Sequence, residues 1–260
     1  MNVLNRFRLD GKRALVTGAS RGLGREMALA LASAGADIVL VARPSDDLDA
    51  TAGDIGAIGR EVTVLPADVS DPESAVAVCT RALAEAGPVD ILVNNVGGRR
   101  ENIQLQDTPL ATWRKLVDLN LTSAVACTKV IGGAMIDRGT GGRIINVASI
   151  NAFVAGRGIS GRHYETAKAA LVQFTRSIAV DWAPHGITAN AICPGLFMTA
   201  PNRRWLKERP EVIDAAVAMI PAGHAGDPED LGPLAVYLAS DASRFMTGAA
   251  LVIDGGFTCL

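Results

Sequence analysis

The sequence of 260 residues has few aromatic residues and almost no net charge. Aromatic residues make up 4% of the chain and the formal net charge is -2, so the overall charge favours neither a nucleic acid nor an anionic membrane as a partner. No uninterrupted apolar run approaches the roughly 18 residues of a membrane-spanning helix, and the first residues lack the apolar centre of a signal peptide. We therefore expect a cytoplasmic protein that binds neither nucleic acid nor membrane.

Cysteine is also sparse, and the residues that commonly bind metals are scattered. The four cysteines are separated by 48, 66 and 66 residues and form no CxxC pair, and the three histidines show no HExxH spacing. We expect no metal site and reduced, mostly buried thiols. The cysteines are Cys79, Cys127, Cys193 and Cys259.

Strand-like and helix-like patterns alternate along the chain. Between the strand-like runs lie helical patterns such as the one from Ala75 to Ala86, to which Asp71-Pro72 supplies a cap and a first-turn proline. This alternation predicts a parallel sheet with helices on both faces, because parallel strands need crossover connections. Strands are expected over residues 12–17, 37–42, 61–66, 89–93, 143–148, 187–193 and 249–253.

No repeat and no linker-like segment divides the chain. We therefore expect a single α/β domain over residues 1–260, a Rossmann-type doubly wound parallel sheet of about seven strands. In such sheets ligands bind beyond the carboxyl ends of the strands. The residues that follow each strand are therefore the first candidates for chemistry.

A glycine-rich turn closes the first expected strand and opens a helix. Residues 17–24, TGASRGLG, have GxxxGxG spacing and lack the Lys-Ser/Thr of a phosphate-binding P-loop. Glycines allow the backbone to approach a pyrophosphate, whose charge is met by free amides at the positive end of a helix. The alternative is that these glycines only make a tight turn. The candidate cofactor contacts in this turn are Gly18, Ser20, Arg21, Gly22, Leu23 and Gly24.

The residue at the end of the second strand bears on the choice of cofactor. Arg43 lies 19 residues after Gly24, and an arginine there favours the 2'-phosphate of NADP, whereas an acid favours the 2'-hydroxyl of NAD. Arg21 could flank the same phosphate. We therefore favour NADP(H); NAD(H) stays open, because Asp46 or Asp47 could reach the ribose instead.

Tyr164 and Lys168 are separated by four residues, which places both on one face of a helix. A tyrosine is a poor acid or base at neutral pH, but a unit positive charge ~4.5 Å away contributes ~4 kcal/mol at an effective dielectric of 20. Lys168 is therefore expected to lower the pKa of Tyr164. Ser149 ends the fifth strand, and Asn120 lies within an apolar helical pattern, where its amide needs a partner or a bound water.

In combination and in order, these motifs resemble the short-chain dehydrogenase/reductase family, of the branch with chains of this length. The resemblance covers about residues 10 to 256, and the overall pattern is similar to gluconate 5-dehydrogenase-like and 3-oxoacyl-carrier-protein reductase-like members. Its motifs are the glycine turn, Asp68-Val69 after strand three, Asn94-Asn95-Val96-Gly97 after strand four, Asn120, Ser149, Tyr164-xxx-Lys168, and Pro194-Gly195 with Thr199 after strand six.

The resemblance implies an NAD(P)(H)-dependent oxidoreductase that interconverts a secondary alcohol and a ketone. Tyr164 would be the general acid/base, and Ser149 would hold and polarise the reacting oxygen. Lys168 would lower the Tyr164 pKa and bind the nicotinamide ribose, and Asn120 would anchor a water in a proton relay. The other implied cofactor contacts are Asp68, Val69, Asn95, Val96, Gly97, Pro194, Gly195, Phe197 and Thr199. A homotetramer, or alternatively a homodimer, is also implied.

The sequence says less about the substrate. A lid is expected over about residues 200–222, and arginines in three segments suggest a basic mouth for a sugar, polyol or sugar acid. Solvated surface arginines are the alternative. The enzymatic runner-up is a 3-oxoacyl-thioester reductase, and a remote alternative is a non-catalytic dinucleotide-binding regulatory protein. The basic residues concerned are Arg99, Arg100, Arg157, Arg162, Arg203, Arg204, Lys207 and Arg209.

Overall fold

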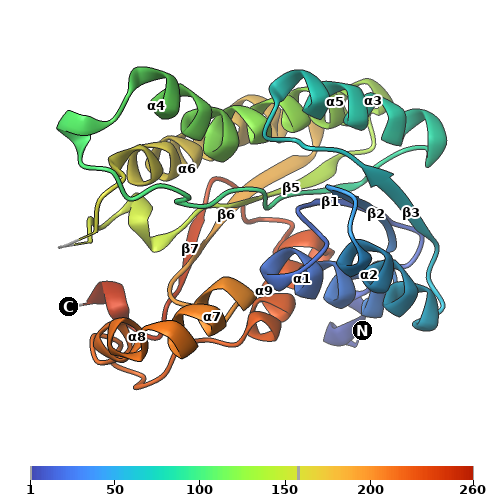
Figure 1. Cartoon of the computed structure of the whole chain (residues 1–260). Coiled ribbons are helices and arrows are strands. Elements are labelled where there is room, and N and C mark those ends of the chain that lie inside the picture. The colour runs from blue at the N-terminus through green and yellow to red at the C-terminus, as the bar shows by residue number, and fades with distance from the viewer. Residues whose placement is uncertain (1, 157–158, 260) are drawn as a thin grey trace.

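The computed structural model describes residues 2–156 and 159–259. Over this part of the chain, seven parallel strands form one sheet in the order β3-β2-β1-β4-β5-β6-β7 (Figure 1). Each expected strand is confirmed, with ends that differ by at most two residues. The strands are β1 (Arg13–Thr17), β2 (Asp37–Ala42), β3 (Val62–Pro66), β4 (Ile91–Asn94), β5 (Gly142–Val147), β6 (Ile187–Pro194) and β7 (Ala250–Ile253).

Helices cover both faces of this sheet, which confirms the doubly wound α/β fold. In Figure 1, α3 to α6 lie on one face, α1, α2 and α9 lie on the other, and α7 and α8 lie near the C-terminus. The helices are α1 (Gly22–Ser33), α2 (Asp46–Ala57), α3 (Pro72–Glu85), α4 (Leu110–Val117), α5 (Ser123–Arg138), α6 (Arg162–Trp182), α7 (Ala200–Glu208), α8 (Pro210–Val217) and α9 (Gly232–Ala239).

The order of the strands determines where a ligand can bind. β1 lies between β2 and β4, and the chain leaves β1 first toward β2 and β3, then returns to β4 and continues toward β7. Helices that follow β1 and β4 therefore lie on opposite faces, and the crevice between them opens at the carboxyl ends of these strands. The glycine turn after β1 and the Asn-Asn-Val-Gly turn after β4 meet at this point.

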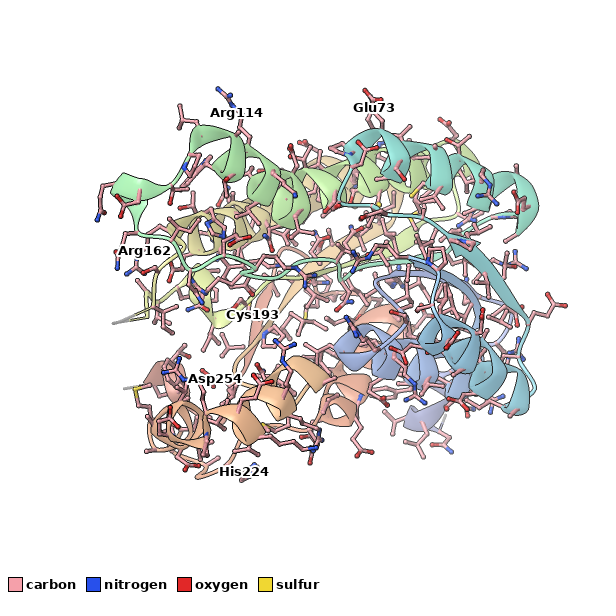
Figure 2. All side chains as sticks on the ribbon, in the orientation of Figure 1. Glu73, Arg114, Arg162, Cys193, His224 and Asp254 are labelled. Carbon is pink, nitrogen blue, oxygen red and sulfur yellow. The ribbon has the colours of Figure 1, made fainter. Side chains whose placement is uncertain are left out.

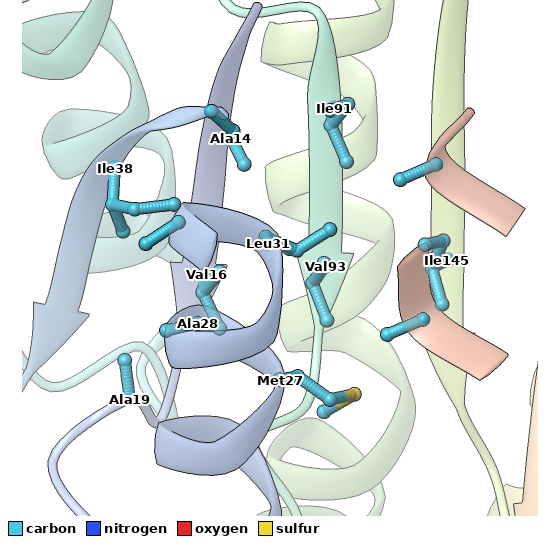
Figure 3. Packing of buried hydrophobic residues seen from close by; sticks show 14 of the residues in the cluster. Ala14, Val16, Ala19, Met27, Ala28, Leu31, Ile38, Ile91, Val93 and Ile145 are labelled. Atoms are coloured by element: carbon cyan, nitrogen blue, oxygen red, sulfur yellow. The ribbon is translucent and has the colours of Figure 1, made fainter. Parts of the chain in front are cut away.

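The core fixes α1, and with it the glycine turn, against the sheet. Met27 and Leu31 of α1 are fully buried and pack with Val16 of β1 and Val93 of β4 (Figure 3). Burial of one such side chain contributes about 1.5–3 kcal/mol. The same apolar spacing that predicts the helix thus also holds its first turn at the end of β1.

One long helical run has the composition of a membrane span. Residues Leu110–Arg138, from α4 through α5, pass a test of length and mean hydropathy, yet 56% of the most apolar window is buried inside the molecule. α5 packs against α3, β4 and β5, so its apolar residues belong to the core. Polar residues such as Asp118 and Asn120 interrupt the run, so its apolar residues are not continuous in the sequence.

Candidate active site

The two turns at the crevice are fastened to each other. Asn95 Nδ2 donates hydrogen bonds to the carbonyl oxygens of Thr17 (3.0 Å) and Gly18 (3.2 Å), so the side chain of Asn95 holds the glycine turn. Gly18 has a positive φ of 65°, and a Cβ on Gly24 would overlap the Gly18 carbonyl oxygen and Asn95 Nδ2. Only glycine fits at Gly24, because the backbone and Asn95 already fill that space.

The start of α1 is open to an anion. No side chain of the described residues caps this helix at Arg21, so its first amides lie free at the positive end of the helix. A Cβ on Gly22 would lie 3.5 Å from Thr199 Cγ2, which places Thr199 beside the same turn. This backbone cradle fits the pyrophosphate of a dinucleotide.

The side chain of Phe197, one of the implied cofactor contacts, packs inside the protein. The ring is buried against Gly226, where a Cβ would come within 2.7 Å of Phe197 Cε1. The Phe197 carbonyl oxygen accepts from Asn202 Nδ2 at 2.7 Å. Phe197 can therefore offer only its backbone amide to a bound cofactor. Gly195 follows β6 and packs against Asp254, where a Cβ would come within 2.7 Å of the Asp254 Cβ.

Positive charge gathers at the end of β2. Arg43 is exposed there, and Arg21 lies 4.0 Å from the Asp47 carboxylate, with both side chains exposed. Partial burial acts to raise the pKa of Asp68, but hydrogen bonds from Ser70 and the charge of Arg43 outweigh it and hold the pKa below its ordinary value. Arg21 and Arg43 are thus two exposed arginines whose charge fits a 2'-phosphate, while Asp47 is paired with Arg21.

Asn120 lies in a turn that the sequence does not reveal. Residues Asp118–Thr122 form a π-helical turn between α4 and α5, and the Asn120 side chain is fully buried. Its Oδ1 accepts from the Gly98 amide (2.8 Å), and its Nδ2 donates to the carbonyl oxygens of Gly98 (3.0 Å) and Leu116 (2.9 Å). The buried side-chain amide of Asn120 thus finds most of its hydrogen-bond partners in the loop after β4. A π turn of this kind is frequent at functional sites.

Lys168 is brought to the same place from α6. Its side chain is buried and Nζ donates to the Val147 carbonyl oxygen at 2.8 Å. A Cβ on Gly97 would lie 2.8 Å from Lys168 Nζ and 2.9 Å from Asn120 Oδ1, so these two groups both border Gly97. Burial lowers the pKa of Lys168 to about 8.

Tyr164 and Ser149 complete the group of four. Asn151 N donates to Ser149 Oγ at 3.1 Å, which fixes the hydroxyl beyond the end of β5. The ring centroid of Tyr164 lies 5.8 Å from Lys168 Nζ. Burial raises the pKa of Tyr164 above its ordinary value, although hydrogen bonding with Ser149 and the charge of Arg99 act to lower it.

The pKa of Tyr164 is thus shifted in the direction opposite to the expectation from sequence. That expectation took account of the charge of Lys168 and left out the loss of water around the hydroxyl. The structure also contains a cation closer to the ring than Lys168: the Arg99 guanidinium carbon lies 4.9 Å from the Tyr164 centroid. Sequence reasoning placed Arg99 at the mouth and missed this contact, because it joins segments far apart in the chain.

Cys193 lies inside the molecule near the end of β6 (Figure 2), and it interacts electrostatically with Tyr164 and Lys168. The side chain is fully buried, and burial raises the pKa of its thiol to about 11. The thiol is therefore neutral at pH 7 and adds no charge beside Tyr164 and Lys168. In the described chain Cys79 and Cys127 are likewise buried and unpaired, whereas Cys259 is exposed.

Most of the expected basic mouth is neutralised by neighbouring acids. Arg99 and Arg162 share Glu165, and the arginines of α7 and the one directly before α8 also have acidic partners. Arg157 lies outside the described residues, and within the described chain Arg100 and Lys207 have no acidic partner within 4.0 Å. The pairs of the expected lid are Arg203–Asp227 (3.1 Å), Arg204–Glu208 (3.6 Å) and Arg209–Glu211 (3.3 Å).

Comparison with known proteins agrees with this geometry. Residues 18–258 match a family model described as enoyl-(acyl carrier protein) reductase. The chain is 38% identical over 252 residues to the galactitol 2-dehydrogenase (L-tagatose-forming) of Cereibacter sphaeroides, with 97% of each chain covered.

Solved structures give the same result. A short-chain type dehydrogenase/reductase from Mycobacterium marinum has a TM-score of 0.92 at 37% identity, with all of both chains covered. A gluconate 5-dehydrogenase from Burkholderia cenocepacia, in complex with NADP and tartrate, has a TM-score of 0.91 at 35% identity, again with all of both chains covered.

Proposed function

Because this chain belongs to the short-chain dehydrogenase/reductase family and is an NAD(P)-dependent oxidoreductase acting on CH–OH groups, we propose that Asn120, Ser149, Tyr164 and Lys168 form its catalytic group. The observation that supports this most strongly is the meeting of Lys168 Nζ and Asn120 Oδ1 at Gly97, in the crevice that the glycine turn opens. Four residues from three separate segments converge there, and a structural role alone gives no reason for a buried lysine at that point.

Tyr164 transfers the proton in this proposal. Its hydroxyl donates a proton to the carbonyl oxygen during reduction, and the tyrosinate accepts one from the alcohol during oxidation. Ser149 holds the same oxygen in place. Its hydroxyl accepts from Asn151 N at 3.1 Å and donates to Asn151 Oδ1 over a long 3.5 Å, a weak bond that a substrate oxygen would replace. The nicotinamide, when bound, supplies or accepts the hydride.

Lys168 and Asn120 replace the proton that Tyr164 loses. The Lys168 pKa of about 8 allows this group to gain and lose a proton near neutral pH. Asn120 holds the loop at Gly98 and borders Gly97 together with Lys168 Nζ, where it can anchor a relay water. The three residues would thus carry a proton from bulk water through Lys168 to Tyr164 during reduction, and in the opposite direction during oxidation.

NADP(H) is the cofactor that we favour, with NAD(H) as the weaker alternative. The cradle from Gly18 to Gly24 fits a pyrophosphate, Arg21 and Arg43 fit a 2'-phosphate, and the Burkholderia relative binds NADP. Replacement of Arg43 by Ala should weaken NADPH binding by about 10- to 100-fold, the loss expected for one charge-assisted phosphate contact, and leave NADH binding unchanged. Titration of both nucleotides measures this, and an equal loss for the two would reject the assignment.

A polyol, sugar or sugar acid is the substrate class that we propose. The relatives named above are a galactitol 2-dehydrogenase and a gluconate 5-dehydrogenase, and their names share a polyol or sugar-acid substrate. The family description favours the second candidate, a 3-oxoacyl-thioester reductase. Turnover of galactitol, gluconate and an acetoacetyl thioester with each cofactor separates them, and exclusive turnover of the thioester or of apolar ketones would reject the sugar-related substrate.

We also propose that α7 and α8, within residues 200–222, form a lid, and that one domain carries the whole activity. Free buried thiols fit a cytoplasmic protein. Exposed apolar side chains at Leu110 of α4, Val180 of α6 and Phe245 support pairing between copies, which we propose gives a homotetramer, with a homodimer as the alternative. Light scattering during gel filtration tests this, and a monomer at micromolar concentration would contradict it.

A further inference from the structure

We propose that Arg99 is a positioning residue for the reaction: it fastens the first turn of α6 and places a permanent positive charge against the face of the Tyr164 ring. This inference rests on the proposed role of Tyr164 as acid/base. Arg99 lies in the loop after β4, whereas Tyr164 lies at the start of α6. The guanidinium carbon is 4.9 Å from the ring centroid, within the range of about 6 Å in which a cation and an aromatic face attract.

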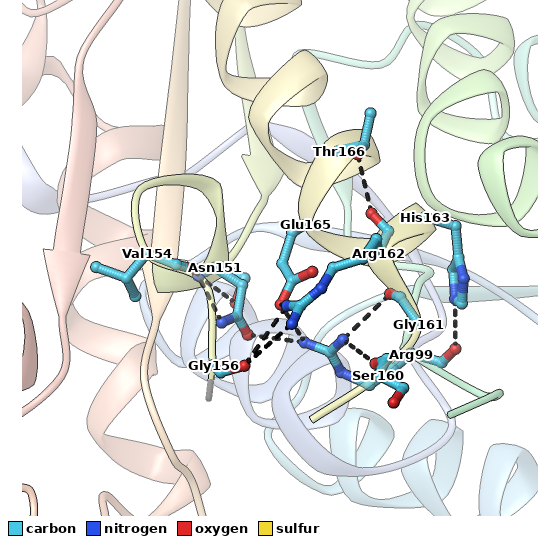
Figure 4. A network of polar contacts seen from close by, with 11 residues as sticks. Arg99, Asn151, Val154, Gly156, Ser160, Gly161, Arg162, His163, Glu165 and Thr166 are labelled. Carbon is cyan, nitrogen blue, oxygen red and sulfur yellow. Dashed lines mark hydrogen bonds and ion pairs between the residues drawn. The ribbon is translucent and has the colours of Figure 1, made fainter. Parts of the chain in front are cut away.

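The guanidinium is held by the backbone that leads into α6. Arg99 Nη1 donates to the carbonyl oxygens of Ser160 (2.7 Å) and Gly161 (3.2 Å), as Figure 4 shows. His163 Nε2 in turn donates to the Arg99 carbonyl oxygen at 2.9 Å. Gly161 has a φ of +85°, and a Cβ there would overlap the Glu101 carbonyl oxygen, so the two segments approach as closely as their backbones allow. The position of Tyr164 is therefore fixed by Arg99 on one side.

The charge around Arg99 is not balanced. Glu165 Oε1 accepts from both Arg162 (2.9 Å) and Arg99 (3.3 Å), so two cations share one carboxylate (Figure 4). Glu165 is buried, and its Oε2 has no hydrogen-bond partner among the described residues. The two arginines and one carboxylate therefore leave a net charge of one beside Tyr164. The side chain of Arg99 is only 17% exposed, so water screens its charge little.

Arg99 is also connected to the Ser149 hydroxyl, through Asn151. Its Nη2 lies 3.5 Å from Asn151 Oδ1, and Asn151 N donates to Ser149 Oγ at 3.1 Å. A single arginine thus contacts Tyr164 directly and Ser149 through one residue. No other described cation has both connections.

The titratable and charged groups that face Tyr164 come from three segments. Glu165 and Lys168 lie on α6, Arg99 comes from the loop after β4, and Cys193 comes from β6. The Cys193 thiol is neutral at pH 7 and Glu165 is held by two arginines, so Arg99 and Lys168 are the cations that favour a tyrosinate. Because the Lys168 pKa is about 8, its charge fades above that pH, whereas an arginine stays charged.

The test compares Arg99→Met, Arg99→Lys and Arg162→Met with the wild-type protein over a range of pH. Without the charge of Arg99, the tyrosine holds its proton more tightly. In the pH–rate profile of alcohol oxidation, we expect the rising limb of Arg99→Met to move to higher pH. Turnover should be about 10-fold lower than wild type at pH 7 and should recover as the pH rises. Arg99→Lys should keep the limb closer to wild type. Arg162→Met is the matched control, because Arg162 binds the same Glu165, whereas the cations over the Tyr164 ring in the described chain are Arg99 and Lys168.

A second readout does not depend on turnover. The chain has only two tyrosines, Tyr164 and Tyr237, so the ultraviolet absorbance of tyrosinate, corrected with Tyr164→Phe, reports the ionisation of Tyr164 alone. It should move to higher pH in Arg99→Met. An unmoved titration, or an equal movement in Arg162→Met, would overturn the inference. Retained turnover in Tyr164→Phe would instead reject the proposed role of Tyr164 itself, so the two failures are distinguishable.

Discussion

Replacement of Lys168 by Met should give a protein that is inactive but more stable without cofactor. Lys168 is buried, and its pKa is lowered from 10.5 to about 8, which corresponds to roughly 3 kcal/mol of unfavourable charge burial at pH 7. Met has a similar length and packs well in apolar surroundings. The loss of Lys168 leaves the Val147 carbonyl oxygen without its hydrogen bond, at a cost of about 1–3 kcal/mol. A net gain of about 1 kcal/mol remains, or about 2–4 °C in Tm.

The pH dependence of this gain identifies its cause. In the wild-type protein the native pKa of Lys168 lies below the unfolded value, so the unfolded chain binds more protons between about pH 8 and 10.5, and wild-type stability from this group rises across that window. The advantage of Lys168→Met should therefore be largest below pH 8 and shrink above it. Urea unfolding at pH 7 and 9.5, followed by tryptophan fluorescence, measures the difference. A variant that is less stable than wild type at pH 7, or a difference that does not change with pH, would refute the reasoning.

Three further predictions follow from the packing. Gly24→Ala should weaken NADPH binding and cost about 1–3 kcal/mol of stability, because the new Cβ overlaps Gly18 and Asn95. Gly53→Ala in α2 is the control: its new Cβ meets no atom within 4 Å, so the variant should gain up to about 1 kcal/mol. Equal shifts of Tm in the two variants would contradict this. Asn120→Leu should lower turnover far more than NADPH affinity. It should also cost about 2–4 kcal/mol of stability, because the Gly98 amide and carbonyl lose their hydrogen-bond partner. Calorimetry measures the stability and steady-state kinetics the turnover, and unchanged turnover would count against the relay. Leu31→Ala should cost about 2–5 kcal/mol in urea unfolding, and a change below about 1 kcal/mol would show that α1 is not held by the core.

Those parts of the fold that depend on local sequence could be predicted. The strands follow runs of valine and isoleucine, and their ends lie within two residues of the expected positions. The cap at Asp71 is also as expected: its carboxylate accepts from the amides of Glu73 (3.3 Å) and Ser74 (3.2 Å). These features depend on neighbouring residues alone, which is why sequence periodicity and turn chemistry suffice to find them.

The remaining features depend on contacts between distant segments. The π turn at Asn120 has no local signal, because its sequence continues an ordinary apolar helical pattern. The contact of Arg99 with the start of α6 spans about 60 positions, and burial, which decides the direction of the Tyr164 pKa, is invisible in a sequence. One pair of the expected basic mouth, Arg204–Glu208, does have a local signal, since residues four apart on a helix are neighbours.

Tyr164→Phe tests the central claim most directly, because it removes one hydroxyl and leaves the ring in place. With the best substrate of the polyol, sugar-acid and thioester panel, turnover should fall by about 10²–10⁴-fold, the usual contribution of a general acid/base. The Kd for NADPH should stay within about 3-fold of wild type, since the glycine turn and Arg43 do not depend on that hydroxyl. Turnover near the wild-type rate, with NADPH still bound, would contradict the assignment of Tyr164 as the acid/base.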